Sequence, residues 1–314
     1  MKKYVFGVDV GGTTVKIGLL TSDGSMLEHW QIPTVTENGG CRILPDISDA
    51  ILHKINERKL EKEDIIGIGL GVPGPVFDDG TIHKAANLGW GVFNVKETLS
   101  DLTGLPVAVG NDANVAALGE MWRGGGVGYK NVVIITLGTG VGGGLILDGK
   151  ILNGTHGSAG ELGHIPVVDP ENEPEACGCG KHGCLEQYAS AEGVLRLTRR
   201  YLTSHPEVDS PLRSAQRLSS KVLYEAVRDQ DPAALAITDQ LYRYLGKALS
   251  MVGVVLDPEC ILIGGGLSNA GQVLLDGITK YYHQYAFPAV DPAVVHLASL
   301  GNMAGMYGSA KLLL

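Results

Sequence analysis

The chain has 314 residues, 44% of them hydrophobic, which is enough for two domains with separate cores. Its 34 acidic and 25 basic residues give a net charge of −9, and the basic residues are mostly scattered, so we expect no nucleic-acid partner. No apolar run reaches the length of a signal-peptide core or a membrane span, so we expect a soluble cytoplasmic protein without a membrane partner.

The first part of the chain is typical of a strand meander that leads into alternating helices and strands. Strands are expected at 4–12, 14–21 and 26–33, with glycine where the first two meet. A helix over about 41–59 and an apolar strand at 65–76, which runs into a Gly/Pro loop, should follow.

The next stretch predicts a helix at 94–104 with a glycine stop, a strand at 106–112 and a helix that starts at 113. A buried strand at 131–140 and its hairpin partner at 141–149 then repeat the opening pattern weakly.

Residues 150–190 are loop-rich, 191–257 are mostly helical, and 261–271 predict a strand that enters a glycine turn before a further helix. Two similar halves, each with a glycine hairpin, imply a nucleotide held in a cleft between two lobes.

The stretch DVGGTTVK at 9–16 places an acid, two glycines and two threonines on one tight turn. Backbone N–H groups and hydroxyls there could face phosphate oxygens, and the acid could hold Mg²⁺ through water. The Walker pattern is absent, and a glycine hairpin is common, so this motif alone leaves a plain turn open. The candidate nucleotide-binding residues are Asp9, Gly11, Gly12, Thr13, Thr14 and Lys16.

A second glycine motif, LGTGVGGG at 137–144, matches the G-x-G-x-x-G dinucleotide spacing at Gly138, Gly140 and Gly143. That motif must open a helix, whereas the following LILDG is strand-like, so a second phosphate hairpin that includes Thr139 fits better.

A third cluster, Gly264, Gly265 and Gly266, ends a strand. Because glycine has no side chain, an adenosine could lie directly against the backbone there. The alternative is that the cluster is a simple strand-to-helix turn.

Asp112, in GNDAN, is the candidate catalytic base. A carboxylate at a strand end can accept the proton of a substrate hydroxyl that attacks a γ-phosphorus. The alternative is that Asp112 only caps the following helix. The catalytic interpretation is favoured by side chains suited to a polyol, which are Asn87, Asn111, Glu161 and Glu186.

Cys177, Cys179 and Cys184 lie within eight residues and, with one histidine, could form a Cys₃His metal site. His164 is the preferred fourth ligand, but spacing leaves His182 and His156 open.

A disulfide is the competing interpretation of this cluster, although three cysteines cannot pair without remainder. Cys41 and Cys260 are expected to be inert thiols in core elements.

Together these motifs resemble those of ROK-family sugar kinases, most of all the bacterial ATP-dependent glucokinases. The resemblance covers nearly the whole chain, through DVGGTT, GVPGPV, NLGW, GNDAN, LGTGVGGG, GELGH, CGCGKHGCLE and LIGGGL. It implies an α/β fold of the two-lobed, actin-like ATPase (ribonuclease H-like) class. Residues 1–118 plus 301–314 would form one lobe and 119–300 the other, with the last helix, near 302–313, returning to the first lobe.

The resemblance also implies phosphorylation of glucose to glucose 6-phosphate by ATP and Mg²⁺, with Asp112 as the general base. It implies structural Zn²⁺ on His164, Cys177, Cys179 and Cys184, which favours His164 over the other histidines. The sugar would be held by Gly74, Asn87, Asn111, Asp112, Glu161, His164 and Glu186.

Relatives suggest a homodimer, and related kinases act on fructose, N-acetylmannosamine or N-acetylglucosamine, so these sugars are alternatives to glucose. A sugar-sensing regulator without catalysis is a further alternative. ROK repressors carry a helix-turn-helix domain before the first phosphate strand, and here that strand is expected to start at about residue 4, which disfavours a DNA reader.

Overall fold

The computed structural model describes residues 3–314. They divide into two compact units. Unit 1 takes the described part of Met1–Lys130 with Gly144–Gly160 and Ser299–Leu314, and unit 2 takes Asn131–Gly143 and Glu161–Ala298. The lobe bounds inferred above differ in placing 119–130, 144–160 and 299–300 with the second lobe, and they stay a prediction. Among the described residues, no helix is long and apolar enough to span a membrane.

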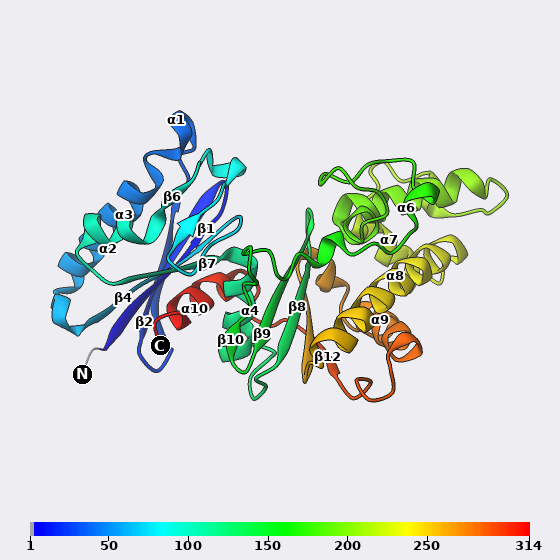
Figure 1. Cartoon of the computed structure of the whole chain (residues 1–314). Coiled ribbons are helices and arrows are strands. Elements are labelled where there is room, and N and C mark those ends of the chain that lie inside the picture. Colours follow the sequence, from blue (N-terminus) through cyan, green and yellow to red (C-terminus); the bar gives the residue numbers. More distant parts are fainter. Residues whose placement is uncertain (1–2) are drawn as a thin grey trace. The chain divides into compact units, whose positions relative to one another are not determined.

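A five-stranded sheet with the order β3-β2-β1-β4-β7 lies in unit 1 (Figure 1). Its strands in that order are Met26–Pro33, Thr14–Thr21, Tyr4–Val10, Ile65–Val72 and Val107–Asn111. β1 pairs antiparallel with β2 and parallel with β4, and β4 pairs parallel with β7. The central strands are buried and almost continuously apolar, whereas edge strand β3 alternates between half-buried and exposed positions.

Helices cover both faces of this sheet. On one face, Phe6 and Val8 of β1 join a core with α2 (Ile43–Arg58) and α3 (Val95–Thr103). On the other, Val5 packs with Ala310 of α10 (Ala304–Lys311), which also packs against α4 (Asp112–Arg123). The last helix of the chain therefore packs within the same unit as the first strands.

A second five-stranded sheet has the order β10-β9-β8-β11-β12. Its strands in that order are Lys150–Ile151, Val141–Leu147, Val132–Leu137, Cys260–Gly264 and Val294–Leu297. β11 pairs parallel with both β8 and β12. The order matches that of the first sheet, position by position, which confirms the internal repeat expected from the sequence.

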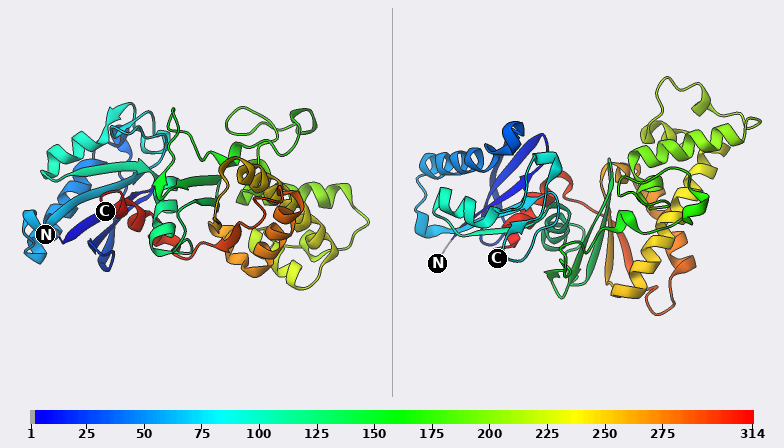
Figure 2. Two further views of the ribbon diagram at one scale, coloured as in Figure 1. Left: turned by 60° about the horizontal axis from the view of Figure 1, so that its bottom comes forward. Right: turned by 45° about the horizontal axis from the view of Figure 1, so that its top comes forward.

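The helices of unit 2 follow the cysteine-rich segment. They are α5 (Glu186–Ala189), α6 (Ala191–Ser204), α7 (Ser220–Arg228), α8 (Pro232–Leu256) and α9 (Gln272–Tyr285). The side chains of Ser190, Ser219 and Asp231 accept backbone N–H bonds at the starts of α6, α7 and α8, which fixes where these helices begin. The yellow α8 packs along the orange α9 (Figure 2).

The remaining elements are short. They are α1 (Glu37–Gly40), β5 (Thr81–Ile82), β6 (Phe93–Asn94) and 3₁₀ turns at Lys62–Asp64, Ala86–Leu88, Leu162–His164, Pro170–Asn172, Pro211–Arg213, Gly266–Ala270 and Gly301–Met303.

The expected core position of Cys41 is wrong. Its side chain is exposed at the kink between α1 and α2, whereas Cys260 is buried in β11 as expected. The apolar spacing of α2 starts only at Ile43, so the two residues before it are not part of the buried face.

Candidate functional site

In unit 1, the predicted nucleotide and sugar residues gather at one edge of the first sheet. β1, β4 and β7 are parallel, and the register pairs Asp9 with Gly71 and Val72 with Asn111. Their carboxyl ends therefore meet, which brings Asp9, the Gly74 loop and Asp112 to the same edge.

The first glycine hairpin, between β1 and β2, is held by two hydrogen bonds of the Gly11 backbone. Gly11 N–H donates to Thr14 O at 3.0 Å, and the Thr34 hydroxyl donates to Gly11 O at 2.7 Å. Asn87 lies beside this hairpin, since its amide nitrogen is 3.9 Å from where a Cβ on Gly12 would sit.

Asp9 and Lys16 face each other across this hairpin, with Lys16 Nζ 3.6 Å from Asp9 Oδ2. Burial raises the pKa of Asp9, and the Lys16 ammonium opposes that rise. The pair leaves a partly exposed carboxylate and ammonium next to the loop backbone, which suits binding of a metal-bound polyphosphate.

Asn111, and not Asp112, is the N-cap of α4. Its Oδ1 accepts from Ala113 N at 3.0 Å and Asn114 N at 3.2 Å, while its Nδ2 donates to Gly74 O at 3.1 Å and Asp112 Oδ1 at 3.0 Å. The neighbouring Asn111 therefore caps the helix, and the capping role considered for Asp112 does not apply. Asp112 is the first residue of the helix, and the Asn111 amide orients its carboxylate.

In unit 2, the second glycine hairpin is fastened to the start of α5. Gly138 N–H donates to Gly140 O at 2.9 Å within the turn, and Val141 N–H donates to Glu186 Oε2 at 2.9 Å. A Cβ on Gly140 would lie 2.6 Å from Glu186 Oε2, so a larger residue here would displace this carboxylate from its present position. Gly140, Thr139 and Glu186 line a hollow of about 340 Å³.

The third glycine cluster follows β11. Gly265 has φ +83°, and a Cβ there would lie 2.5 Å from the backbone N and O of Leu137, so this position requires glycine. Gly266 lines a separate hollow of about 270 Å³ with three residues that the sequence did not single out, Lys221, Tyr224 and Arg228. Their i, i+3, i+7 spacing places them on one face of α7. This helical spacing could have grouped the three residues from the sequence alone.

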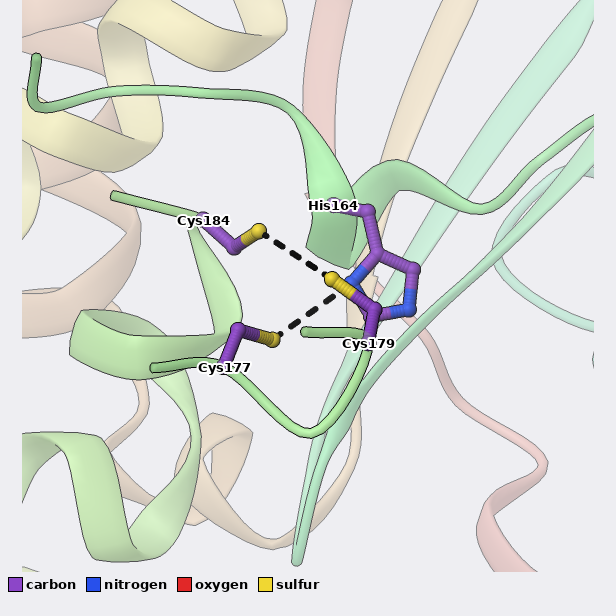
Figure 3. A group of neighbouring side chains, drawn as sticks. All are labelled: His164, Cys177, Cys179 and Cys184. Carbon is purple, nitrogen blue, oxygen red and sulfur yellow. Dashed lines mark hydrogen bonds between the residues drawn. The ribbon is translucent and has the colours of Figure 1, made fainter. Parts of the chain in front are cut away.

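The cysteine cluster is assembled from two loop segments (Figure 3). One ligand atom from each of His164, Cys177, Cys179 and Cys184 lies within 4.8 Å of the others. Cys177 Sγ is 3.7 Å from His164 Nδ1, and the sulfurs of Cys179 and Cys184 are 3.7 Å apart.

These distances fit a metal better than a disulfide. A disulfide needs sulfurs about 2.05 Å apart, and all five cysteines are free. Zinc with bonds of about 2.3 Å to each thiolate would hold tetrahedral sulfurs about 3.8 Å apart. His182, a competing ligand in the sequence, instead places its Nδ1 2.8 Å from Glu173 O.

His164 presents its two ring nitrogens in different directions. Nδ1 faces Cys177, whereas Nε2 lies 3.9 Å from Glu161 Oε2, and both side chains are partly exposed. Cys177 Sγ also lies 3.9 Å from Glu186 Oε1. The structure therefore brings Glu161, His164 and Glu186, three of the expected sugar-binding residues, to the border of the cysteine cluster.

A buried ion pair beside the cysteine loop was missed by sequence reasoning. The Glu173 carboxylate is 1% exposed and receives two hydrogen bonds from the Arg200 guanidinium, both 2.7 Å. The partners are 27 residues apart, so no local spacing could reveal them.

Comparison with known proteins agrees with the motifs and the fold. The sequence model of the ROK family matches residues 5–314. The chain is 45% identical to a glucokinase of Halalkalibacterium halodurans over 99% of its own length and 94% of that protein.

Two solved structures show the same architecture. The ROK hexokinase of Thermus thermophilus matches with a TM-score of 0.81 and 31% identity, over 98% of this chain and 97% of that one. A ROK family glucokinase of Streptomyces griseus in complex with glucose and AMPPNP matches with a TM-score of 0.73 and 34% identity, over 98% of both chains. The expected two-lobed, actin-like ATPase fold is thereby confirmed, and the chain belongs to the ROK family.

Proposed function

We propose that this protein is a glucokinase, which transfers the γ-phosphoryl group of ATP to the 6-hydroxyl of glucose. The observation that carries the proposal is the Asp112 carboxylate, oriented by Asn111 at the edge of the sheet where the first glycine hairpin lies. The chain is similar over nearly its full length to a glucokinase and to a ROK glucokinase solved with glucose and AMPPNP. This similarity supports glucose as the acceptor and ATP as the donor.

Asp112 would act as general base. As the 6-oxygen of glucose bonds to the γ-phosphorus, the bond from that phosphorus to the β,γ-bridging oxygen breaks and ADP leaves. The 6-hydroxyl proton passes to the Asp112 carboxylate. The Asn111 amide and the Ala113 N–H both donate to Asp112 Oδ1, and these two bonds hold the carboxylate at the start of α4.

Both units would supply phosphate-binding backbone. Unit 1 contributes the first hairpin, with Lys16 and Asp9 at its base. When bound with ATP, Mg²⁺ neutralises charge on the phosphates and would be held by Asp9 through water. In unit 2 the proposed ATP-binding residues are Gly138, Thr139, Gly140, Gly264, Gly265 and Gly266.

The sugar hydroxyls would be bound by amides, carboxylates and backbone. In unit 1 these are Gly74, Asn87 and Asn111, although Asn111 would have to give up one of its present hydrogen bonds. In unit 2 they are Glu161, His164 through Nε2, and Glu186.

The cysteine cluster would be a structural zinc site with His164 Nδ1 and three thiolates as ligands. When bound, the metal cross-links the 161–164 segment to the 177–184 loop, next to the sugar-binding carboxylates. We expect about one zinc per purified chain, and a content below about one per two chains would contradict a site of this kind.

We further propose a cytoplasmic homodimer. The absence of disulfides among the five cysteines fits a reducing compartment. Met251, Val254 and Val255 expose apolar side chains on the last turns of α8, which supports association with a second copy. Sedimentation should give twice the mass of the chain.

The function is tested by coupling ADP release to glucose addition. Asp112→Asn should lower kcat by about 100-fold or more, because the amide cannot accept the proton. Glucose binding measured by calorimetry should persist. Asp101→Asn, on the exposed side of α3, is the matched control and should keep wild-type turnover.

Near-wild-type turnover of Asp112→Asn would refute the assigned base. A panel of hexoses and N-acetylhexosamines ranked by kcat/KM tests the acceptor, and a ranking led by a sugar other than glucose would refute that part.

A further inference from the structure

The cysteine loop is fastened to the rest of unit 2 by a polar cluster that contains no expected metal ligand. We call it the Glu173 cluster, and it consists of Glu173, Glu175, Tyr188, Arg196 and Arg200. Glu173 and Glu175 precede the first cysteine, Tyr188 lies on α5, and the two arginines lie one turn apart on α6.

The Glu173 carboxylate is the centre of this cluster. Besides its two bonds from Arg200, it accepts hydrogen bonds from the Tyr188 hydroxyl and from Glu175 N, the latter at 3.0 Å. All four acceptor directions are thus used, and the side chain is shielded from water. A buried carboxylate with this many partners has one well-defined position.

A second layer of bonds ties the same segment to α5. Arg196 donates to Glu175 Oε2 at 2.9 Å and to Gln187 O at 2.7 Å. The Gln187 amide donates to Glu175 O at 2.9 Å and accepts from Cys184 N at 3.1 Å. Gln187 and Tyr188 directly follow Glu186, so the cluster holds the helical turn that carries this carboxylate.

The cluster also reaches into the loop. His182 lies between Cys179 and Cys184, and its Nδ1 is 2.8 Å from Glu173 O. The loop is therefore restrained at His182 by a contact that needs no metal, in addition to whatever its cysteines bind.

We propose that the Glu173 cluster is a metal-independent anchor that positions Glu186 for the sugar, so that glucose binding persists in part when the metal is removed and then depends on Glu173. The proposal rests on the proposed function, because it concerns how the sugar-binding carboxylate is held. Glu173 is a positioning residue, since it is buried, is not one of the four expected metal ligands, and acts through Tyr188 and Arg200.

Two restraints on one helical turn should be coupled. With the metal bound, loss of the cluster is partly compensated by the cross-linked cysteines. Without it, fewer restraints act on this turn: the cluster remains, together with the bond from Val141 N–H to Glu186 Oε2. Loss of the cluster should therefore weaken sugar binding more in the stripped protein. When binding at one site changes affinity at another, the change is typically about 5- to 150-fold, and removal of the metal is such a case.

The test measures the glucose dissociation constant by calorimetry, with and without prior chelation of the metal. The variants are Glu173→Gln, which breaks the ion pair, and Tyr188→Phe, which removes one donor and keeps the pair. Glu192→Gln is the matched control because it breaks an exposed 2.7 Å ion pair with Arg199 on the same helix.

We expect the metal-stripped wild type and Glu192→Gln to bind glucose with similar, reduced affinity. In the stripped protein, Glu173→Gln should weaken binding at least about fivefold more than it does in the loaded protein, and Tyr188→Phe should change binding in the same direction. Equal losses in both forms, or no glucose binding by stripped wild type, would overturn the proposal. If Glu173→Gln does not fold, Tyr188→Phe decides through the same comparison.

Hydrogen exchange of backbone amides at 177–188 separates failure of this proposal from failure of the proposed function. In the stripped protein these amides should remain protected in wild type and exchange faster in Glu173→Gln and Tyr188→Phe. That result is independent of sugar. Unchanged exchange in both variants would refute the anchor even if glucose proves not to be the substrate.

Discussion

Replacement of Glu120 by glutamine should strongly destabilise unit 1. Glu120 lies in α4, is 1% exposed and accepts three backbone hydrogen bonds. Its Oε2 accepts from Gly125 N at 2.9 Å and Ser299 N at 3.0 Å, and its Oε1 accepts from Leu300 N at 2.8 Å. One carboxylate thus joins the segment after α4 to the segment that leads into the last helix.

The magnitude follows from the number of acceptors. A glutamine oxygen in the Oε2 position could keep the bonds from Gly125 and Ser299, but the amide nitrogen would then face the N–H of Leu300. The N–H of half-buried Leu300 would lose its partner, at a cost of about 1–3 kcal/mol, and the other bonds would lose their ionic assistance. We therefore expect Glu120→Gln to lower the free energy of unfolding by about 2–4 kcal/mol.

Tryptophan fluorescence in urea is the suitable assay, because Trp30, Trp90 and Trp122 all belong to unit 1. Glu57→Gln is the matched control. It removes a half-exposed carboxylate paired with Lys54 at 2.7 Å, so its effect should stay within about 1 kcal/mol. The reasoning fails if Glu120→Gln and the control unfold at the same urea concentration with the same dependence of the unfolding free energy on urea. The three backbone bonds would then not stabilise the unit.

Two further predictions concern unit 2. Gly265→Ala should lower the thermal stability clearly more than Gly266→Ala, because only the first introduces a Cβ 2.5 Å from Leu137 backbone atoms at positive φ; equal melting temperatures would contradict the contact. The Arg200 guanidinium holds the pKa of Glu173 at about 2, below its ordinary 4.5, so ionised Glu173 stabilises the fold above pH 4.5 and this contribution is lost as the pH falls through about 2. The difference in unfolding free energy between wild type and Glu173→Gln should therefore shrink by about 3 kcal/mol from pH 6 to pH 2, and a pH-independent difference would contradict the ion pair.

Much of the architecture could be predicted because its signals are local. A β-branched run that ends in glycine predicts a strand and a tight turn from neighbouring residues alone, and both glycine hairpins lie where expected. Asn94 and Gly104 likewise bound α3 through contacts within four residues.

The sequence analysis placed Asp112 at the end of a strand, directly before a helix expected to start at 113, and left open whether Asp112 caps that helix. Asn and Asp are about equally good caps, so the sequence could not choose between adjacent Asn111 and Asp112. The structure places Asn111 in the capping geometry because its amide also reaches Gly74 O from the neighbouring strand loop. That contact depends on the parallel pairing of β4 and β7.

The sequence by itself determined most of the long strands, the glycine turns, the limits of α3 and the candidate residues for phosphate, sugar or metal binding, because each depends on a few consecutive residues. Only the tertiary structure decided which members of that set meet. It placed His164 rather than His182 among the three cysteines, exposed Cys41, and paired Glu173 with Arg200. These outcomes depend on residues far apart in the chain, whose approach is fixed by how whole elements pack and not by any local pattern.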